Sequence, residues 1–368
     1  MINIPFLKKL GTPIFSLNFF AAKPNHVVGI DIGTFSTKVI QLRYEKERGV
    51  LETYGELLNE TYFKSQNPEA GFQHRSDQEV ASLLKDLLRE ANVTSKDAVL
   101  AVPASASFVT TVPFPPVTEK ELKEAVPYEA RRFVPIPIAE VTLDWEVLGM
   151  NEARDKLEVL LIAVPKEIIE KFKRVAALSG LNLHALEVET FGMVRSLGGG
   201  DLGPAGFINF GHRTTTLAVT DRGKVRVSHN FGRGSQEITK ILEKGLGINH
   251  ERAEAIKREV GLSEKIEEKE IVSVVAPFVE TLLAEVERFL SIYNRKAPRS
   301  VQKINLTGGG SNLKGLVEHA VARFGVEVNR GNPFARTVAP AFMQPILREL
   351  GPSFSVAVGL ALHQLTAR

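Results

Sequence analysis

The stretch at residues 27–38 reads Val27-Val28-Gly29-Ile30-Asp31-Ile32-Gly33-Thr34-Phe35-Ser36-Thr37-Lys38. Its apolar first part predicts a buried strand that ends near Asp31, and residues 39–42 predict a second strand. Gly33 permits a close backbone approach to a ligand. The hydroxyl and N–H groups of residues 34–37 suit phosphate oxygens, and Asp31 suits a hydrated Mg²⁺. The stretch therefore predicts a phosphate-binding turn, with a plain β-hairpin as the alternative.

A second stretch repeats this pattern 178 positions later. It reads Gly206-Phe207-Ile208-Asn209-Phe210-Gly211-His212-Arg213-Thr214-Thr215-Thr216-Leu217-Ala218-Val219. The equivalent positions are Asp31 and Asn209, Gly33 and Gly211, and Ser36-Thr37 and Thr214-Thr215. Each copy continues through a turn into a third strand. Two such turns that face each other would clamp a polyphosphate, so the repeat favours the phosphate hypothesis.

Composition narrows the function classes. The chain has 368 residues, a length that predicts two or three domains. Its net charge of +3 is too small to indicate a nucleic-acid-binding protein. The absence of cysteine excludes disulfides, thiolate chemistry and cysteine-ligated metals, and fits a reducing compartment. The eight histidines show no zinc-ligand spacing, and no Ser/His/Asp set stands out.

Residues 1–25 form a leader ahead of the first strand. Lys8-Lys9 precede the mostly apolar segment 10–22, which resembles a secretory signal diluted by proline and polar residues. We expect the leader to be retained, and to be flexible or in contact with a membrane or partner, with cleavage as the alternative. No apolar run reaches the ~20 residues of a membrane helix.

Hydrophobic periodicity predicts an α/β protein with two related halves and an insertion. The first half is predicted as strands over 27–58, a helix over 77–92 and strands over 98–102 and 183–188. The insertion is predicted as strand 107–114, a helix from 118, and strands 141–148 and 156–164, followed by helix 166–179. Thr118 and Glu121 form a capping box, and Pro127 is expected to kink or end the inserted helix. After a hinge at 198–204, the second half is predicted to contain two helices that are N-capped by Ser235 and Asn249 and run to about 244 and 260. Helices at 276–294 and 351–364 and a strand at 304–306 are also predicted.

Two patterns in the second half suit a nucleotide. Gly308-Gly309-Gly310-Ser311 follows a strand, so the backbone can approach a flat or anionic ligand, and a helix N-terminus after it would add positive charge. The pattern is neither a P-loop nor a dinucleotide fingerprint, and a tight turn explains it equally well. Glu254 and Lys257 share one helix face and by themselves predict a solvated ion pair.

Together these motifs resemble the actin-like ATPase superfamily after residue 25, and within it the FtsA-like PilM family of type IV pilus assembly proteins. The matching superfamily motifs are Asp31-x-Gly33-Thr34, Asn209-x-Gly211, Gly308-Gly309-Gly310-Ser311 and Ala253-Glu254-Ala255-Ile256-Lys257. The PilM-like runs are Leu122–Ala130, Val134–Val141, Asp144-Trp145 and Gly351–Leu362.

The resemblance implies an actin-like ATPase fold, in which two related halves surround a nucleotide cleft and the first half carries an inserted SHS2-like subdomain, 1C. It divides the chain into subdomain 1A (26–103 and 183–202), 1C (104–182), 2A (203–235 and 296–368) and 2B (236–295).

The resemblance also implies ATP with Mg²⁺ as cofactors. Asp31 would orient metal-bound water. Glu254 and Lys257 would hold the ribose and adenine, and this expectation replaces the solvated ion pair that their spacing alone predicts. The expected cofactor contacts are Asp31, Gly33, Thr34, Phe35, Ser36, Lys38, Asn209, Gly211, His212, Arg213, Thr214, Glu254, Lys257, Gly308, Gly309, Gly310 and Ser311.

Asn209 departs from the superfamily, in which an aspartate is usual. An amide carries no charge and cannot take a proton, so we expect ATP to be bound but hydrolysed slowly or not at all. Glu187 is the candidate to position a catalytic water, with Glu189 or a packing role as alternatives.

The expected function is an interaction at the inner face of the cytoplasmic membrane. The 1C subdomain and the first half would bind the N-terminal cytoplasmic peptide of PilN. The chain would thereby link PilN and PilO to the assembly ATPase, with indirect membrane association and no nucleic acid. One alternative is an FtsA-like cell-division or filament-forming protein, although that family continues into a membrane-binding helix and this sequence ends at Arg368. The other is a small-molecule kinase, for which the insertion lacks a polar sugar-binding run.

Overall fold

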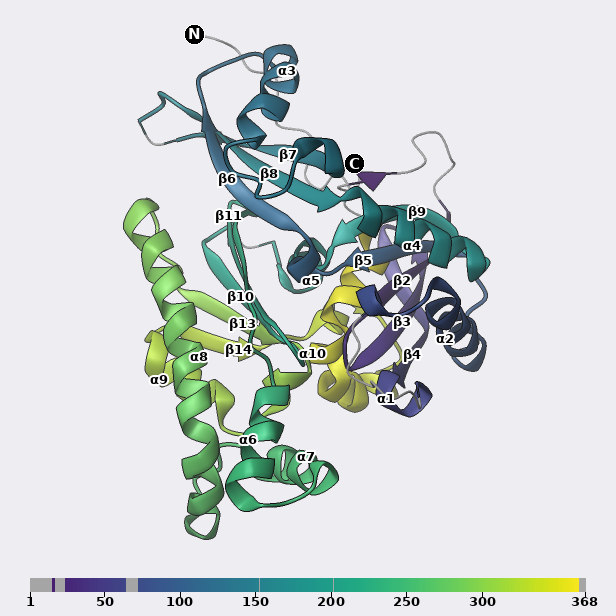
Figure 1. Ribbon diagram of the computed structural model, residues 1–368, viewed down its shortest axis with the longest axis vertical. Coiled ribbons are helices and arrows are strands. Elements are labelled where there is room, and N and C mark those ends of the chain that lie inside the picture. The colour runs from purple at the N-terminus through teal and green to yellow at the C-terminus, as the bar shows by residue number, and fades with distance from the viewer. Residues whose placement is uncertain (1–14, 17–23, 64–71, 152, 201, 364–368) are drawn as a thin grey trace. The chain divides into compact units, whose positions relative to one another are not determined.

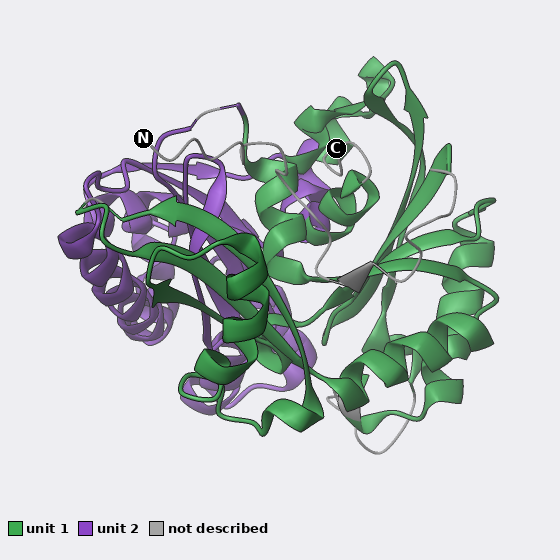
Figure 2. Cartoon of the chain, turned by 90° about the horizontal axis from the view of Figure 1, so that it is seen from above, with its two compact units in different colours: residues 1–199, 333–347, 356–368 green, residues 200–332, 348–355 purple. Residues whose placement is uncertain are grey.

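The computed structural model describes residues 15–16, 24–63, 72–151, 153–200 and 202–363, so most of the leader and the end of the predicted closing helix lie outside the described residues. The described chain divides into two compact units (Figure 2). Unit 1 contains the residues up to Gly199, together with Pro333–Leu347 and those from Val356 onward. Unit 2 contains Gly200–Asn332 and Arg348–Ser355.

Unit 1 is built on a seven-stranded sheet in the order β1-β9-β5-β2-β3-β4-β15. The stretch around Asp31 and Gly33 forms the antiparallel strands β2 (His26–Ile32) and β3 (Ser36–Glu45), and β4 (Arg48–Leu58) pairs with β3. On the other side of β2, β5 (Asp97–Val102) is parallel to it and β9 (Asn182–Val188) is parallel to β5. The two-residue strands β1 (Phe15–Ser16) and β15 (Thr337–Val338) pair with β9 and β4.

Helices cover both faces of this sheet. A side chain at Gly55 on β4 would contact Ala91 and Leu87 at the end of α2 (Asp77–Glu90), whereas one at Gly29 on β2 would collide with α10 (Gln344–Ala361). These two glycines face opposite sides because cross-strand partners share a face and neighbours along a strand alternate. Outside the insertion, unit 1 also contains α1 (Asn59–Tyr62), α4 (Lys166–Leu178) and α5 (Glu189–Leu197).

The insertion has the predicted strand, helix, strand, strand order. Strands β6 (Phe108–Phe114), β8 (Leu157–Pro165) and β7 (Val141–Met150) form a three-stranded antiparallel sheet, and α3 (Glu119–Ala130) packs on it. Thr118 and Glu121 form the predicted capping box. The helix continues past Pro127, because Val126 and Ala130 are buried against the sheet and this packing offsets the hydrogen bond that proline removes.

Unit 2 repeats the strand order of the central part of unit 1. Three antiparallel strands, β12 (Lys224–Phe231), β11 (Thr215–Asp221) and β10 (Ala205–Phe210), are followed by β13 (Lys303–Thr307) and β14 (Glu327–Arg330), both parallel to β10. The same order, β4-β3-β2-β5-β9, occurs in unit 1. The predicted duplication is therefore confirmed. Its helices are α6 (Gln236–Leu246), α7 (His250–Glu259), α8 (Lys269–Lys296) and α9 (Leu316–Phe324) (Figure 1).

Several elements differ from the sequence predictions. Helix α8 begins at Lys269, before the predicted start, and continues through Pro277 because Val275 and Val279 are buried in the core of unit 2. Helix α5 was not predicted. The triple glycine leads into a 3₁₀ turn, Gly309–Asn312, and α9 starts only at Leu316, so the expected helix N-terminus beside the glycines is absent from this part of the described chain.

The C-terminal segment also packs differently from the expectation. Residues 333–347 and 356–363 belong to unit 1, although they fell within the predicted subdomain 2A. The physical reason is close packing, since a Cβ at Gly29 would lie 2.1 Å from the carbonyl oxygen of Ala357 in α10. Only the middle of α10 belongs to unit 2.

Candidate functional site

The first predicted phosphate turn is closed by short-range hydrogen bonds. The N–H of Gly33 donates to the carbonyl oxygen of Ser36 at 3.1 Å. The side-chain amide of Asn59, which is buried, donates to the carbonyl oxygen of Gly33 at 2.9 Å. A Cβ at Gly33 would lie 2.8 Å from the oxygen of Ser36, so this turn requires glycine.

The second predicted phosphate turn has the same local geometry. The N–H of Gly211 donates to the carbonyl oxygen of Thr214 at 3.0 Å, and a Cβ at Gly211 would lie 2.8 Å from that oxygen. Ser235, which was expected to cap α6 with its hydroxyl, instead donates its N–H to the carbonyl oxygen of Gly211 at 2.9 Å. The two turns are therefore equivalent in backbone geometry as well as in sequence.

Asp31 lies on β2 directly before the first turn, with a carboxylate that receives no hydrogen bond from any described residue. Burial raises its pKa, and the positive charge of Lys38 opposes that effect. Lys38 is the cross-strand neighbour of Asp31 on β3. A carboxylate with unused acceptor sites beside a glycine turn is the arrangement expected for a water-mediated Mg²⁺ contact.

The glycines of the third predicted motif have different surroundings. Gly308 has a φ of +82°, and a Cβ there would lie 2.3 Å from Oδ1 of Asn209. A Cβ at Gly310 would lie 2.7 Å from the ring of Phe210. At Gly309 the neighbour would be Oγ of Ser353 at 3.7 Å, an ordinary contact. Packing thus requires glycine at 308 and 310, whereas a Cβ at 309 would make only an ordinary contact.

Glu254 and Lys257 belong to a buried network and not to a solvated pair. Oε2 of Glu254 accepts from Nζ of Lys257 at 2.5 Å and from Oγ1 of Thr239 at 2.7 Å. Burial alone would raise the pKa of Glu254, but Lys257 and Thr239 outweigh it and lower that pKa to about 2. Lys257 also donates to the carbonyl oxygen of Ser235 at 3.5 Å. Thr239 was not predicted as a site residue, because no sequence spacing on α6 indicates that it contacts α7.

Ser235 connects two of the predicted motifs. Its N–H contacts the second turn, and its carbonyl oxygen contacts Lys257. Unit 2 thereby brings Asn209 beside Gly308, and the Gly211 turn next to the Glu254–Lys257 pair. The remaining candidates, Thr34, Phe35 and Ser36 in unit 1 and His212, Arg213, Thr214 and Ser311 in unit 2, lie within or directly beside these turns. That the two sets share one cleft stays a prediction.

Glu187, the candidate catalytic residue, is occupied by an ion pair. Its side chain is 1% exposed, and both carboxylate oxygens accept from the guanidinium of Arg195, one of them at 2.7 Å. Burial would raise the pKa of Glu187, but Arg195 lowers it to about 2. The pair links β9 to α5, and these contacts favour a structural role over the positioning of a water.

A family model described as "Type IV pilus assembly protein PilM" matches residues 29–365. The chain belongs to the PilM family. Among solved structures, it is similar to the chain of a PilM-PilN type IV pilus biogenesis complex, with a TM-score of 0.78, 22% identity, and coverage of 92% of this chain and 98% of that one. This result and the family match confirm the predicted resemblance.

More distant relatives share the actin-like fold. MreB5 of Spiroplasma citri bound to AMPPNP has a TM-score of 0.53 and 14% identity, and covers 92% of this chain and 95% of its own. The cell division protein FtsA of Enterococcus hirae is 23% identical over 83% of this chain and 78% of its own length. FtsA of Rhizobium meliloti is 30% identical over 44% of this chain and 40% of its own length. These similarities confirm the predicted superfamily fold.

Within the described ranges, no three histidine, aspartate or glutamate side chains gather as metal ligands. In the same part of the chain, no helix is both long and apolar enough to cross a membrane.

Proposed function

We propose that this PilM-family chain binds ATP with Mg²⁺ and serves as a peptide-docking component of type IV pilus assembly. The observation that carries the nucleotide part is the repeated turn: Gly33 and Gly211 close the same backbone loop with hydrogen bonds of 3.1 and 3.0 Å. Backbone N–H groups in such loops are suited to phosphate oxygens. The MreB5 structure, described as bound to AMPPNP, supports the same assignment by fold.

The residues present fit the proposed cofactors. The Asp31 carboxylate keeps its acceptor sites free, and a Cβ at Gly309 would make only an ordinary contact. We assign the phosphates to the two glycine turns, the metal-bound water to Asp31, and the adenosine to Gly309, Gly310, Glu254 and Lys257. The metal, when bound, would neutralise phosphate charge.

The nucleotide proposal is tested by equilibrium binding of a fluorescent ATP analogue with Mg²⁺. Gly309→Val fills the space beside Ser353, and we expect a loss of affinity of about tenfold or more. Gly232→Val is the matched control, because nothing lies within 4 Å of a Cβ at Gly232. Equal binding by both variants and the unsubstituted chain would show that Gly309 does not face the nucleotide.

The peptide part of the proposal is supported by the similar PilM-PilN complex, whose title names PilN as the partner of that PilM. We propose that the insertion, β6–β8 with α3, and the sheet of unit 1 receive the N-terminal cytoplasmic peptide of the cognate PilN as an extended segment. Through PilN, the chain would associate indirectly with the inner face of the cytoplasmic membrane and couple PilO and the assembly ATPase.

Co-purification with a peptide of about the first dozen residues of the cognate PilN, with and without ATP, tests this docking. Retention of the peptide is the expected result, and a scrambled peptide of equal composition is the control. Equal retention of both peptides would refute the docking proposal.

An FtsA-like filament is the second candidate, favoured by the similarity to FtsA of E. hirae. ATP-dependent polymers whose amount rises with protein concentration would support it.

A further inference from the structure

Three charged side chains form a row across the sheet beside the first phosphate turn. Lys38 on β3 is in register with Asp31 on β2 and with Glu56 on β4. Residues opposite each other on neighbouring strands share one face of the sheet. Nζ of Lys38 lies 3.7 Å from Oε1 of Glu56, and the same oxygen accepts from the hydroxyl of Ser36 at 2.6 Å. Glu56 thus holds two groups that belong to the predicted turn.

This row is poorly solvated and contains two carboxyl groups but only one ammonium group. The side chains of Lys38 and Glu56 are 11% and 28% exposed. The charge of Glu56 also adds to the effect of burial in raising the pKa of Asp31, so the two carboxylates interact. A triphosphate that approaches the turn without a metal would meet two carboxylates and one ammonium group, and the low solvent exposure would weaken the screening of their repulsion.

The duplicated unit contains the same row without charge. Asn209 on β10 is in register with Thr216 on β11, and Thr216 is in register with Asn230 on β12. The side-chain amide of Asn230 donates to the hydroxyl of Thr216 at 3.0 Å. Because the uncharged row supports an equivalent turn, the charges of Asp31, Lys38 and Glu56 are not required by this architecture.

We propose that Glu56 is a positioning residue that makes nucleotide binding depend on Mg²⁺. This inference rests on the proposed ATP site. Glu56 holds Lys38 and Ser36 in place, and its charge disfavours phosphates that arrive without a divalent cation. With the cation present, its charge offsets the second carboxyl group of the row, and Lys38 faces phosphate favourably.

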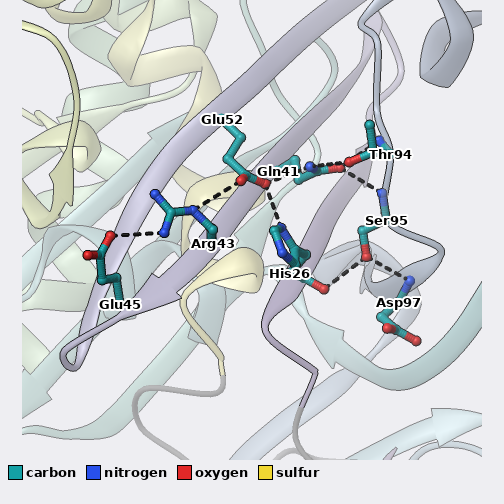
Figure 3. Close-up of polar contacts among 8 residues, drawn as sticks. All are labelled: His26, Gln41, Arg43, Glu45, Glu52, Thr94, Ser95 and Asp97. Atoms are coloured by element: carbon teal, nitrogen blue, oxygen red, sulfur yellow. Dashed lines mark hydrogen bonds and ion pairs between the residues drawn. The ribbon is translucent and has the colours of Figure 1, made fainter.

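The same strand supplies a matched control. Glu52 is also on β4 and partly exposed, but it belongs to the separate network shown in Figure 3. Its Oε2 accepts from Nε2 of Gln41 at 2.7 Å and pairs with Nδ1 of His26 at 2.8 Å, and its Oε1 lies 3.3 Å from Nε of Arg43. Glu52→Gln therefore removes one negative charge from β4 without changing the row beside Asp31.

The test measures the affinity for AMPPNP by calorimetry, in Mg²⁺ and in EDTA, together with the AMPPNP-dependent shift in melting temperature. For the unsubstituted chain and for Glu52→Gln we expect EDTA to weaken binding by about a hundredfold. For Glu56→Gln we expect binding in EDTA to improve about tenfold, with little change in Mg²⁺. Glu56→Asp, which keeps the charge, should restore the Mg²⁺ dependence.

A second variant tests the inference from the other unit. Asn230→Asp places a carboxylate at the position that matches Glu56, and we expect a larger EDTA effect than in the unsubstituted chain. If Glu56→Gln does not fold, the Asn230→Asp variant alone tests whether a carboxylate in this row makes nucleotide binding depend on Mg²⁺. If AMPPNP binds but the ratio of the two affinities is the same in all variants, the role of Glu56 is overturned and the ATP proposal stands. No binding in Mg²⁺ by the unsubstituted chain would overturn the ATP proposal itself.

Discussion

Gly308 and Gly309 are adjacent, but a side chain would be tolerated only at position 309. A Cβ at Gly308 would lie 2.3 Å from Asn209 and would require a φ of +82°. We therefore expect Gly308→Ala to lower the free energy of unfolding by about 2 kcal/mol or more. Gly309→Ala should change it by less than about 0.5 kcal/mol, because its neighbour would be at an ordinary distance. Urea denaturation of both variants measures this difference, and equal losses would contradict it.

Asp144, in the PilM-like run of the insertion, gives the fold a pH dependence. Burial raises the pKa of its carboxyl to about 7, and the hydrogen bond from the N–H of Trp145 at 2.8 Å only partly opposes this. In the unfolded chain the same group titrates near pH 3.9. The folded state therefore holds an extra proton between these values, so stability falls as pH rises from about 4 to about 7.

Asp144→Asn removes that titration. We expect the variant to gain about 1–2 kcal/mol relative to the unsubstituted chain near pH 8, and little or nothing near pH 4. Melting temperatures across this pH range provide the measurement. If the two proteins show parallel pH profiles, Asp144 is not the group responsible.

At the scale of elements, helices α5 and α10 touch through glycine. A Cβ at Gly359 in α10 would lie 1.7 Å from the carbonyl oxygen of Gly192 in α5, so the two helix backbones are in direct contact. Gly359→Ala must push them apart, and we expect a loss of about 2–3 kcal/mol of stability. Gly200→Ala is the control, because nothing lies within 4 Å of a Cβ there. Thermal unfolding of both variants checks the prediction, which a loss of similar size in the control would contradict.

Helices and strands could be predicted where a short run of neighbouring residues specifies them. Strands β2 and β3 were predicted from continuous apolar residues around a glycine turn, and the caps of α2 and α3 are formed by serine or threonine with a glutamate three residues later. The first turns of α8 and the whole of α5 were missed. Pro277 lies within α8, and burial of Val275 and Val279 stabilises the helix despite this local signal.

At the scale of the whole molecule, the two units share a topology but differ in charge beside their turns. Unit 2 has Asn209 where unit 1 has Asp31, and Glu187 is held by Arg195. Because Asn209 cannot take a proton from water and Glu187 is paired with Arg195, we expect ATP turnover slower than ~1 s⁻¹, the low end for ordinary enzymes. A phosphate-release assay on the purified chain measures this. Turnover at or above that rate would refute the prediction, and an unchanged low rate in Glu187→Gln would support the structural role of that residue.

Local sequence patterns are enough to predict the duplicated topology, the insertion and the two glycine turns. These features depend on strand periodicity and on close backbone contacts that only glycine allows, and both are local properties that a sequence displays directly. Three other features could be known only from the folded structure. The C-terminal helix packs largely on unit 1, Glu187 is paired with Arg195, and Glu56 lies in the row beside Asp31. Those contacts join residues far apart in the chain, and their energies come from close packing and from charges with little exposure to water, neither of which leaves a spacing signal.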